Sequence, residues 1–216
     1  MFKINKRYRG RLGLALAGVA LVAAQLSFVA SPASAAPTRN CVGDLTGRAA
    51  LACFATLTEA MTAASDGRFR DAPASAAEAA ADPSFAADVN AANAAGLAAV
   101  GSPTAAGAAG RASVASTLVI SIEYDLRDHD GTGGSLIWQG DKECSNRTTD
   151  VDYDINSYNV SAPAWVDRIS SFRTFANCWT THHESVNFNG ASVGFEGSRS
   201  YIGVAMDNRT SSQEWS

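Results

Sequence analysis

Residues 183–192 read HESVNFNGAS and residues 207–212 read DNRTSS, and these two stretches determine the predicted fold. In the first stretch a ring at His183 is followed by an acid, by Phe188 and by Gly190, with turn-forming residues around Phe188. The second stretch combines an acid and an amide with two serines. Short runs of this kind, punctuated by turn residues, are typical of antiparallel β structure.

A second copy of this pattern lies upstream. Tyr124 and His129 take the ring positions, Asp125 is the acid after the first ring, and residues 166–171 (VDRISS) close the unit. Strand-like runs occur at residues 118–124, 135–138 and 191–195. Because duplication at a spacing of roughly 40 to 60 residues indicates two units of one fold, we predict an antiparallel sandwich or barrel over residues 117–216.

These residues resemble the βγ-crystallin family. Its Greek-key motif has an aromatic ring, four residues, a second ring, one residue, Gly and a following Ser, which residues 183–192 match with His183 in the first ring position. Residues 207–212 match its calcium signature throughout, whereas in the first copy Val166 replaces an acid and His129 stands where Phe or Tyr is usual. The resemblance covers residues 118–216 and implies a mainly β, two-repeat Greek-key β-sandwich.

The same resemblance implies calcium sites, each completed by the hairpin of the other repeat. Ca²⁺ prefers six to eight oxygen ligands, which carboxylate, amide and hydroxyl groups supply. The expected ligands are Asp207, Asn208 and Ser211 with the chain near Asp125 for one site, and Asp167 and Ser170 with the chain near Glu184 for the other. We expect the second site to be weaker because Val166 removes an oxygen ligand. The metal-free alternative is that these Asp and Ser side chains cap turns by hydrogen bonds to the backbone.

The N-terminus has the layout of a secretory signal peptide over residues 1–35: a basic stretch, an apolar run at residues 12–24 and a small-residue triplet ending at Ala35. The apolar run is shorter than the roughly 20 residues that a membrane span needs. Five basic residues lie in the first dozen, so the remainder is five charges more negative than the formal −4 of the whole chain. We therefore expect a secreted, extracellular monomer with no nucleic-acid partner and no membrane association after cleavage.

Four cysteines follow the predicted signal peptide, namely Cys41, Cys53, Cys144 and Cys178. Four cysteines allow three pairings, of which Cys41–Cys53 with Cys144–Cys178 is the most economical. A zinc site would need closer Cys or His pairs, which the sequence lacks. In an exported chain we expect two structural disulfides.

Residues 36–116 are rich in alanine and are predicted to be a helical pro-segment or spacer that ends in a linker near residues 101–110. Leu51, Phe54, Leu57 and Met61 fall on one helical face, which predicts a short amphipathic helix over residues 51–61. The rest of the segment has high helix propensity but few large apolar side chains. We therefore do not expect it to carry the function.

No nucleophile motif, phosphate-binding loop or zinc motif is present in the sequence, so we predict that the protein is not an enzyme. Adjacent His182 and His183 would point to opposite faces of a strand and could not share a ligand. The first hypothesis is a secreted binding module of βγ-crystallin type that binds calcium.

The alternative hypothesis is an inhibitor of extracellular peptidases, because the domain also resembles the small disulfide-bonded metalloproteinase inhibitors secreted by actinobacteria. An inhibitor needs a rigid exposed loop, and the insertion from Cys144 to Ala164 is the candidate. Its acids and aromatic residues suited to a protease cleft are Asp150, Asp152, Tyr153, Asp154 and Tyr158. The plainer interpretation of this insertion is a long crossover connection.

Overall fold

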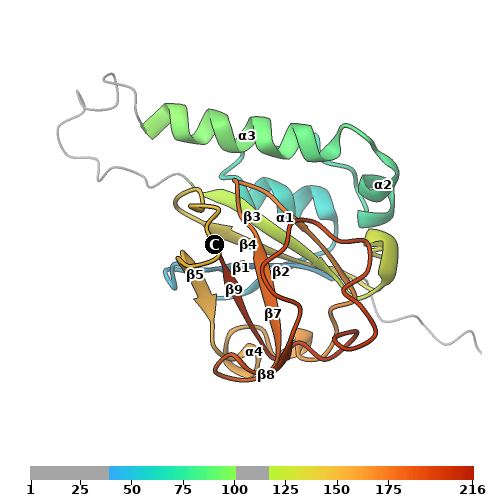
Figure 1. The fold of residues 1–216 in the computed structure, drawn as a ribbon. Coiled ribbons are helices and arrows are strands. Elements are labelled where there is room, and N and C mark those ends of the chain that lie inside the picture. Colours follow the sequence, from blue (N-terminus) through green and yellow to red (C-terminus); the bar gives the residue numbers. More distant parts are fainter. Residues whose placement is uncertain (1–38, 101–116) are drawn as a thin grey trace, which may run out of the picture. The chain divides into compact units, whose positions relative to one another are not determined.

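The computed structural model describes residues 39–100 and 117–216, which belong to one unit (Figure 1). The predicted signal peptide and the linker at residues 101–110 lie outside the described residues. Within the described residues, no helix is both long and apolar enough to span a membrane.

The strands form two sheets. The five-stranded sheet has the order β2-β1-β4-β3-β6 and the four-stranded sheet the order β5-β9-β7-β8. The strands are β1 (Asn40–Asp44), β2 (Ala52–Phe54), β3 (Leu118–Tyr124), β4 (Ser135–Gly140), β5 (Tyr153–Ile155), β6 (Ser171–Thr174), β7 (Thr180–Ser185), β8 (Asn189–Ser192) and β9 (Ser212–Trp215). The β1–β4 pair is parallel and the other pairs are antiparallel.

Each of the two sequence repeats pairs with backbone of the other. β5 belongs to the first repeat but pairs with β9 of the second. In return, Arg199 of the second repeat pairs with Phe172 in β6 of the first. Through β5 and this isolated bridge the two repeats interleave, which is the Greek-key arrangement that the duplicated pattern predicts. The prediction of a mainly β, two-repeat fold is confirmed.

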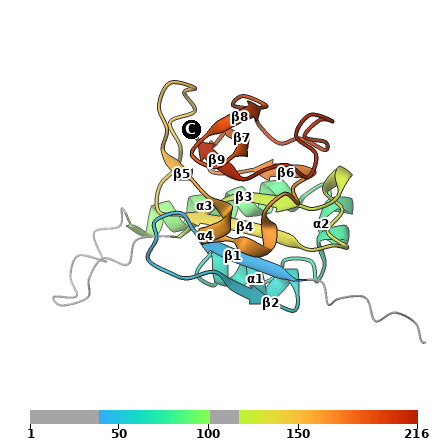
Figure 2. The same cartoon turned by 90° about the horizontal axis from the view of Figure 1, so that it is seen from below.

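Helices cover one face of the five-stranded sheet. They are α1 (Leu57–Ala64), α2 (Ala76–Ala81) and α3 (Phe85–Val100), with α4 (Tyr158–Ser161) and the 3₁₀ turns η2 (Arg127–His129) and η3 (Pro163–Trp165) inside the β domain. Figure 1 shows α1 and α3 on the upper side of the molecule and β7 and β9 on the lower side, and Figure 2 shows β3 and β4 seen from below. The described chain thus has three layers: helices, a five-stranded sheet and a four-stranded sheet.

Two apolar cores fill the spaces between these layers. The core between the sheets includes Leu118, Ile120, Trp138, Trp165 and Trp215. The core between the helices and the five-stranded sheet includes Leu57, Met61, Phe85, Val119, Ile122, Ile137 and Phe175. Since side chains alternate along a strand, β3 contributes to both cores.

The described part of the alanine-rich segment differs from the predicted spacer, because it packs on the β domain. β1 adds a parallel strand to β4, and the helices supply half of the second core. The predicted helix over residues 51–61 is wrong in its first half. Residues 52–54 form β2, and α1 begins only at Leu57, where Thr56 and Glu59 form a capping box.

The cysteines pair as Cys41–Cys53 and Cys144–Cys178, the more economical arrangement expected from their spacing. The first disulfide joins β1 to β2, which explains why residues 52–54 are held as a strand. The second joins the long connection after β4 to the turn before β7.

Candidate functional site

The second serine of each Ser-Ser pair ties the hairpin of its own repeat. Ser171 Oγ donates to the carbonyl oxygen of Leu126 at 2.6 Å and accepts from the backbone N–H of His129 at 3.1 Å. Ser212 makes the corresponding two bonds in the second repeat, with Ser185 and Phe188. These two serines therefore hydrogen-bond the backbone of a turn, which is the alternative to metal binding that the sequence left open.

The first serine of each pair reaches into the loop of the other repeat. Ser170 Oγ donates to Asp207 Oδ1 at 2.5 Å and lies 3.4 Å from Asn208 Oδ1. Ser211 Oγ donates to Asp167 Oδ1 at 3.2 Å. The structure therefore brings Asp207 and Asn208 together with Ser170, and Asp167 together with Ser211, so the two serines are exchanged relative to the expected sets. Asp125 and Glu184, which the expected sets also included, are paired with arginines instead.

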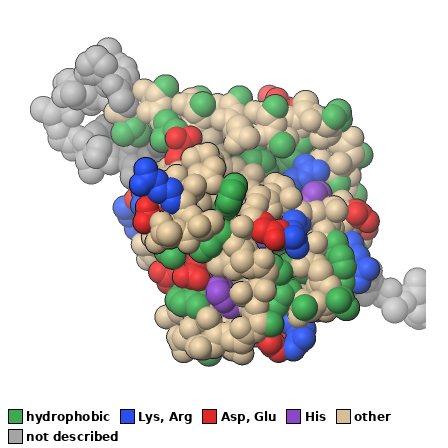
Figure 3. Space-filling view, in the orientation of Figure 1, with side chains coloured by type: hydrophobic (Ala, Val, Ile, Leu, Met, Phe, Trp, Pro, Cys, Tyr) green, Lys and Arg blue, Asp and Glu red, His purple; other side chains and the backbone are tan. Residues whose placement is uncertain are grey.

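Asp125 and Glu184, the acids that follow the first ring of each repeat, pair with an arginine of the same repeat. Asp125 Oδ2 forms an ion pair with Arg168 Nη2 at 2.8 Å, and Glu184 forms an ion pair with Arg209. Acidic and basic side chains also lie beside one another at several places on the face shown in Figure 3. In residues 39–100 and 117–216, no group of three or more His, Cys, Asp and Glu side chains is placed to hold a metal.

Asp207 also contacts a positively charged side chain. Arg127 Nη2 lies 2.8 Å from Asp207 Oδ2, and the hydroxyl of Tyr201 lies 3.4 Å from the same oxygen. Burial acts to raise the pKa of Asp207, but the hydrogen bonds from Ser170 and Arg127 outweigh it, so this pKa lies below its ordinary value. Sequence reasoning missed Arg127 and Tyr201, since both lie outside the signature.

The Asp167 loop is more open. Asp167 is exposed, its carboxylate accepts one hydrogen bond, from Ser211, and it has no ion pair among the described residues. Val166 packs against the core between the sheets, as an apolar residue should, and offers no side-chain oxygen. A cation could be held here by Asp167 and Ser211, with backbone carbonyls and water completing the oxygen set.

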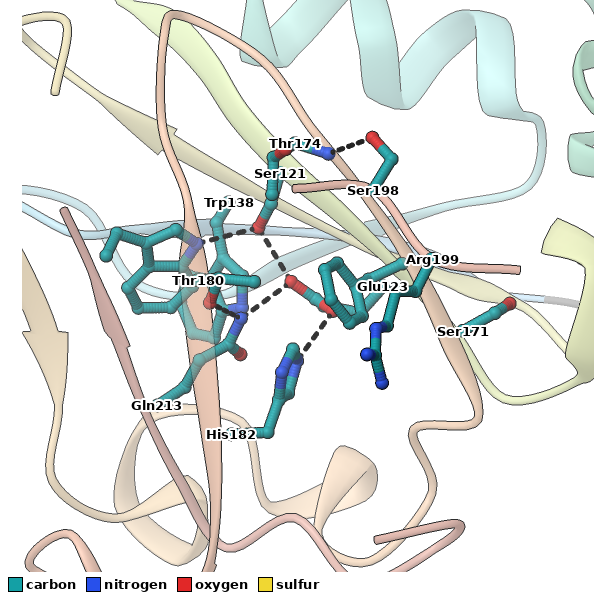
Figure 4. A network of polar contacts seen from close by, with 12 residues as sticks. Ser121, Glu123, Trp138, Ser171, Thr174, Thr180, His182, Ser198, Arg199 and Gln213 are labelled. Atoms are coloured by element: carbon teal, nitrogen blue, oxygen red, sulfur yellow. Dashed lines mark hydrogen bonds and ion pairs between the residues drawn. The ribbon is translucent and has the colours of Figure 1, made fainter. Parts of the chain in front are cut away.

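His182 and His183 point to opposite faces of β7, as predicted. His182 is fully buried between the sheets, and its Nε2 lies 3.1 Å from Glu123 Oε2, whereas His183 Nε2 contacts Glu214 at 2.9 Å. Figure 4 shows the buried network around Glu123, whose other oxygen accepts from Ser121 at 2.7 Å and from Gln213 at 2.9 Å. This buried network joins the two sheets, because Glu123 lies in β3 of one sheet and His182 and Gln213 lie in β7 and β9 of the other.

The insertion after β4 divides into an exposed part and a buried part. Residues 145–151 are exposed, but Tyr153 and Tyr158, which the sequence assigns to a protease-facing surface, are buried. The exposed part is anchored at both ends, by the Cys144–Cys178 disulfide and by Asp152. The carboxylate of Asp152 accepts from Lys142 Nζ at 2.6 Å and from the backbone N–H of Ser145 at 2.7 Å.

Comparisons with known proteins returned distant structural likenesses. No family model and no curated protein matches the chain. A βγ-crystallin domain from Clostridium beijerinckii is similar over 44% of this chain and 95% of its own, with 12% identity and a TM-score of 0.34. A βγ-crystallin domain from Flavobacterium johnsoniae is similar over 45% of this chain and 93% of its own, with 18% identity and a TM-score of 0.33. The fold assignment rests on the strand pairing within the chain itself.

Proposed function

We propose that this chain is an exported, non-enzymatic binding module that binds Ca²⁺ at the loop where Asp167 meets Ser211. The observation that carries the proposal is the exposed carboxylate of Asp167, which accepts a single hydrogen bond from a hydroxyl of the other repeat. Bound calcium would fasten the two repeats to each other at this crossing. Two disulfides favour an oxidising compartment, which supports export.

Calcium titration of the purified full chain tests this proposal. We expect heat of binding and, at calcium about 100-fold above its Kd, a rise in Tm of roughly 5 °C or more. Asp167→Asn should abolish both effects. Asp150→Asn is the matched control, because Asp150 is an exposed acid in the insertion. Absence of heat and of a Tm change in the wild type, or an unchanged response in Asp167→Asn, would contradict the proposal.

The second candidate function is inhibition of an extracellular peptidase by residues 145–151. The supporting observation is the anchoring of this exposed loop by a disulfide and by Asp152. A loop held in one conformation loses less entropy on binding, which is how rigid inhibitors gain affinity.

Peptidase assays separate the two candidates. Thermolysin-type and serine peptidases are incubated with the wild type and with a variant in which residues 145–151 are replaced by Gly and Ser at equal length. Inhibition by the wild type that is lost in this variant supports the second function. The control is Val204→Ser, which changes an 86% exposed apolar residue elsewhere on the surface. Undiminished peptidase activity with the wild type rules this function out for the enzymes assayed.

A further inference from the structure

Arg127 lies at the place where the Asp207 loop would bind a cation. Its Nη2 atom is 2.8 Å from Asp207 Oδ2 and 3.0 Å from the hydroxyl of Tyr201. The centre of its guanidinium lies 3.8 Å from the centroid of the Tyr201 ring. Arg127 is thus held by an ion pair, a hydrogen bond and a cation–π contact at once.

The other oxygen of this carboxylate is also engaged. Ser170 Oγ, from the first repeat, donates to Asp207 Oδ1 at 2.5 Å. Both oxygens of Asp207 therefore have a donor, and one of the donors is positively charged. A calcium ion at this carboxylate would lie close to the guanidinium, and like charges a few ångströms apart repel.

In the corresponding loop of the other repeat, no cation of the described residues pairs with Asp167. Alignment of the rings, Tyr124 with His183 and His129 with Phe188, places Val186 at the position of Arg127. Val186 is uncharged and 37% exposed. The two loops are thus related by the repeat, but Val186 stands in one hairpin where Arg127 stands in the other.

We propose that Arg127 is the built-in cation of the Asp207 loop and replaces a metal there. The guanidinium balances the Asp207 carboxylate and links the first hairpin to the loop of the second repeat without an ion. Calcium would have to displace Arg127 from Asp207, so this loop does not bind calcium in the wild type. It nevertheless matches the calcium signature better than the Asp167 loop does. The inference holds whether or not calcium binds at Asp167.

Substitution of Arg127 tests the inference in the full chain. Arg127→Gln removes the charge, and in EDTA its Tm should be lower than that of the wild type by about 1 to 4 °C. Added calcium should restore the Tm, and calorimetry should show one more calcium site than in the wild type, with an affinity at this loop raised by about tenfold or more. The double variant Arg127→Gln/Asp207→Asn should lose the extra site. Arg147→Gln is the control, because Arg147 is an exposed arginine 3.9 Å from Asp150 and away from Asp207.

A second variant keeps the test decisive if Arg127→Gln does not fold. Asp207→Asn alone should leave the number of calcium ions bound by the wild type unchanged. A lower number in Asp207→Asn would overturn the inference, as would a folded Arg127→Gln chain without additional calcium binding. Calcium binding that is lost only in Asp167→Asn concerns the proposed function instead, so the two failures are distinguishable.

Discussion

At the scale of single residues, Ser171 and Ser212 hold the folded hairpins of the two repeats. Each hydroxyl donates one hydrogen bond and accepts another, and both serines are buried. Alanine at either position would leave a backbone N–H and a carbonyl of the hairpin without their partners. A buried N–H or carbonyl group without a hydrogen-bond partner lowers the stability by more than an average hydrogen bond raises it.

We therefore expect Ser171→Ala and Ser212→Ala each to lower the free energy of unfolding by about 1 to 3 kcal/mol. Urea unfolding followed by tryptophan fluorescence measures this change. Ser192→Ala, at an exposed position of β8, is the control and should stay within about 0.5 kcal/mol of the wild type. Equal effects of the three substitutions would show that the hairpin bonds do not matter.

We expect His129 to make the stability of the protein depend on pH. Burial, and next the charge of Arg173, lower the pKa of His129 below its ordinary value, and its hydrogen bonds to the carbonyl oxygens of Phe172 and Arg199 only partly oppose this. The unfolded chain, in which this pKa is near 6.5, binds the proton more readily than the folded chain. Stability is therefore present above about pH 6.5 and decreases as the pH falls from there toward the folded-state pKa.

The corresponding prediction is a shallower pH dependence in His129→Phe, which places in the first repeat the ring type that the second repeat has at Phe188. Thermal unfolding of both proteins between pH 5 and pH 7.5 measures the effect. The Tm of the wild type should fall more steeply below pH 6.5 than that of the variant, whatever their difference at pH 7.5. Parallel curves would contradict the role of His129.

The candidate site could be predicted only in part at this scale. The signature pointed to Asp167, Asp207 and the serines, because residue types at fixed spacing are visible in one dimension. The exchange of Ser170 and Ser211 between the loops was not visible, since it depends on how the two repeats cross. Arg127 was missed for the same reason, because it lies 80 residues from Asp207 in the sequence.

At the scale of elements, β3 and β4 were predicted because their β-branched and aromatic residues mark strands that are buried on both faces. β1 was missed because Asn40–Asp44 has little apolar character of its own. It is a strand because it pairs with β4 in parallel and is joined to β2 by a disulfide. Gly43 allows this close approach, since a side chain there would overlap the ring of Trp138.

Gly43→Ala tests the packing of β1. The added methyl group would meet the buried Trp138 ring, so we expect a loss of about 1 to 3 kcal/mol in the free energy of unfolding, measured in urea. Gly197→Ala is the matched control, because a methyl group there would meet nothing within 4 Å. It should leave the stability unchanged or slightly higher, since alanine restricts the unfolded chain. A stability loss no larger in Gly43→Ala than in Gly197→Ala would mean that β1 can move away.

At the scale of the whole molecule, the described alanine-rich segment and the β domain share a core. The outer face of the five-stranded sheet carries Val119, Ile122 and Ile137, and these side chains, with Phe175 just after β6, pack against the helices. Residues 117–216 without the helices would expose this apolar face to water. Exposed apolar patches of this kind weaken folding and favour aggregation.

We therefore expect residues 117–216 alone not to unfold cooperatively and to bind the dye ANS, unlike the full chain. Thermal circular dichroism and ANS fluorescence provide the measurement. The full chain under the same conditions is the control. A shortened protein that melts with the same Tm and does not bind ANS would show that the helical segment is the separate spacer that its composition suggested.

The sequence by itself determined the β class of residues 117–216, the duplication and the residue types at the two loops, and it left three possible disulfide pairings. These features follow from residue types and spacings, which can be recognised in the sequence alone. Only the tertiary structure decided that β1 and the helices join the β domain, that Ser170 and Ser211 cross between the repeats, and that Arg127 faces Asp207. Each of these depends on contacts between distant segments: alanine packs closely because it is small, and the cation of Arg127 balances Asp207 only because the fold places the two side by side.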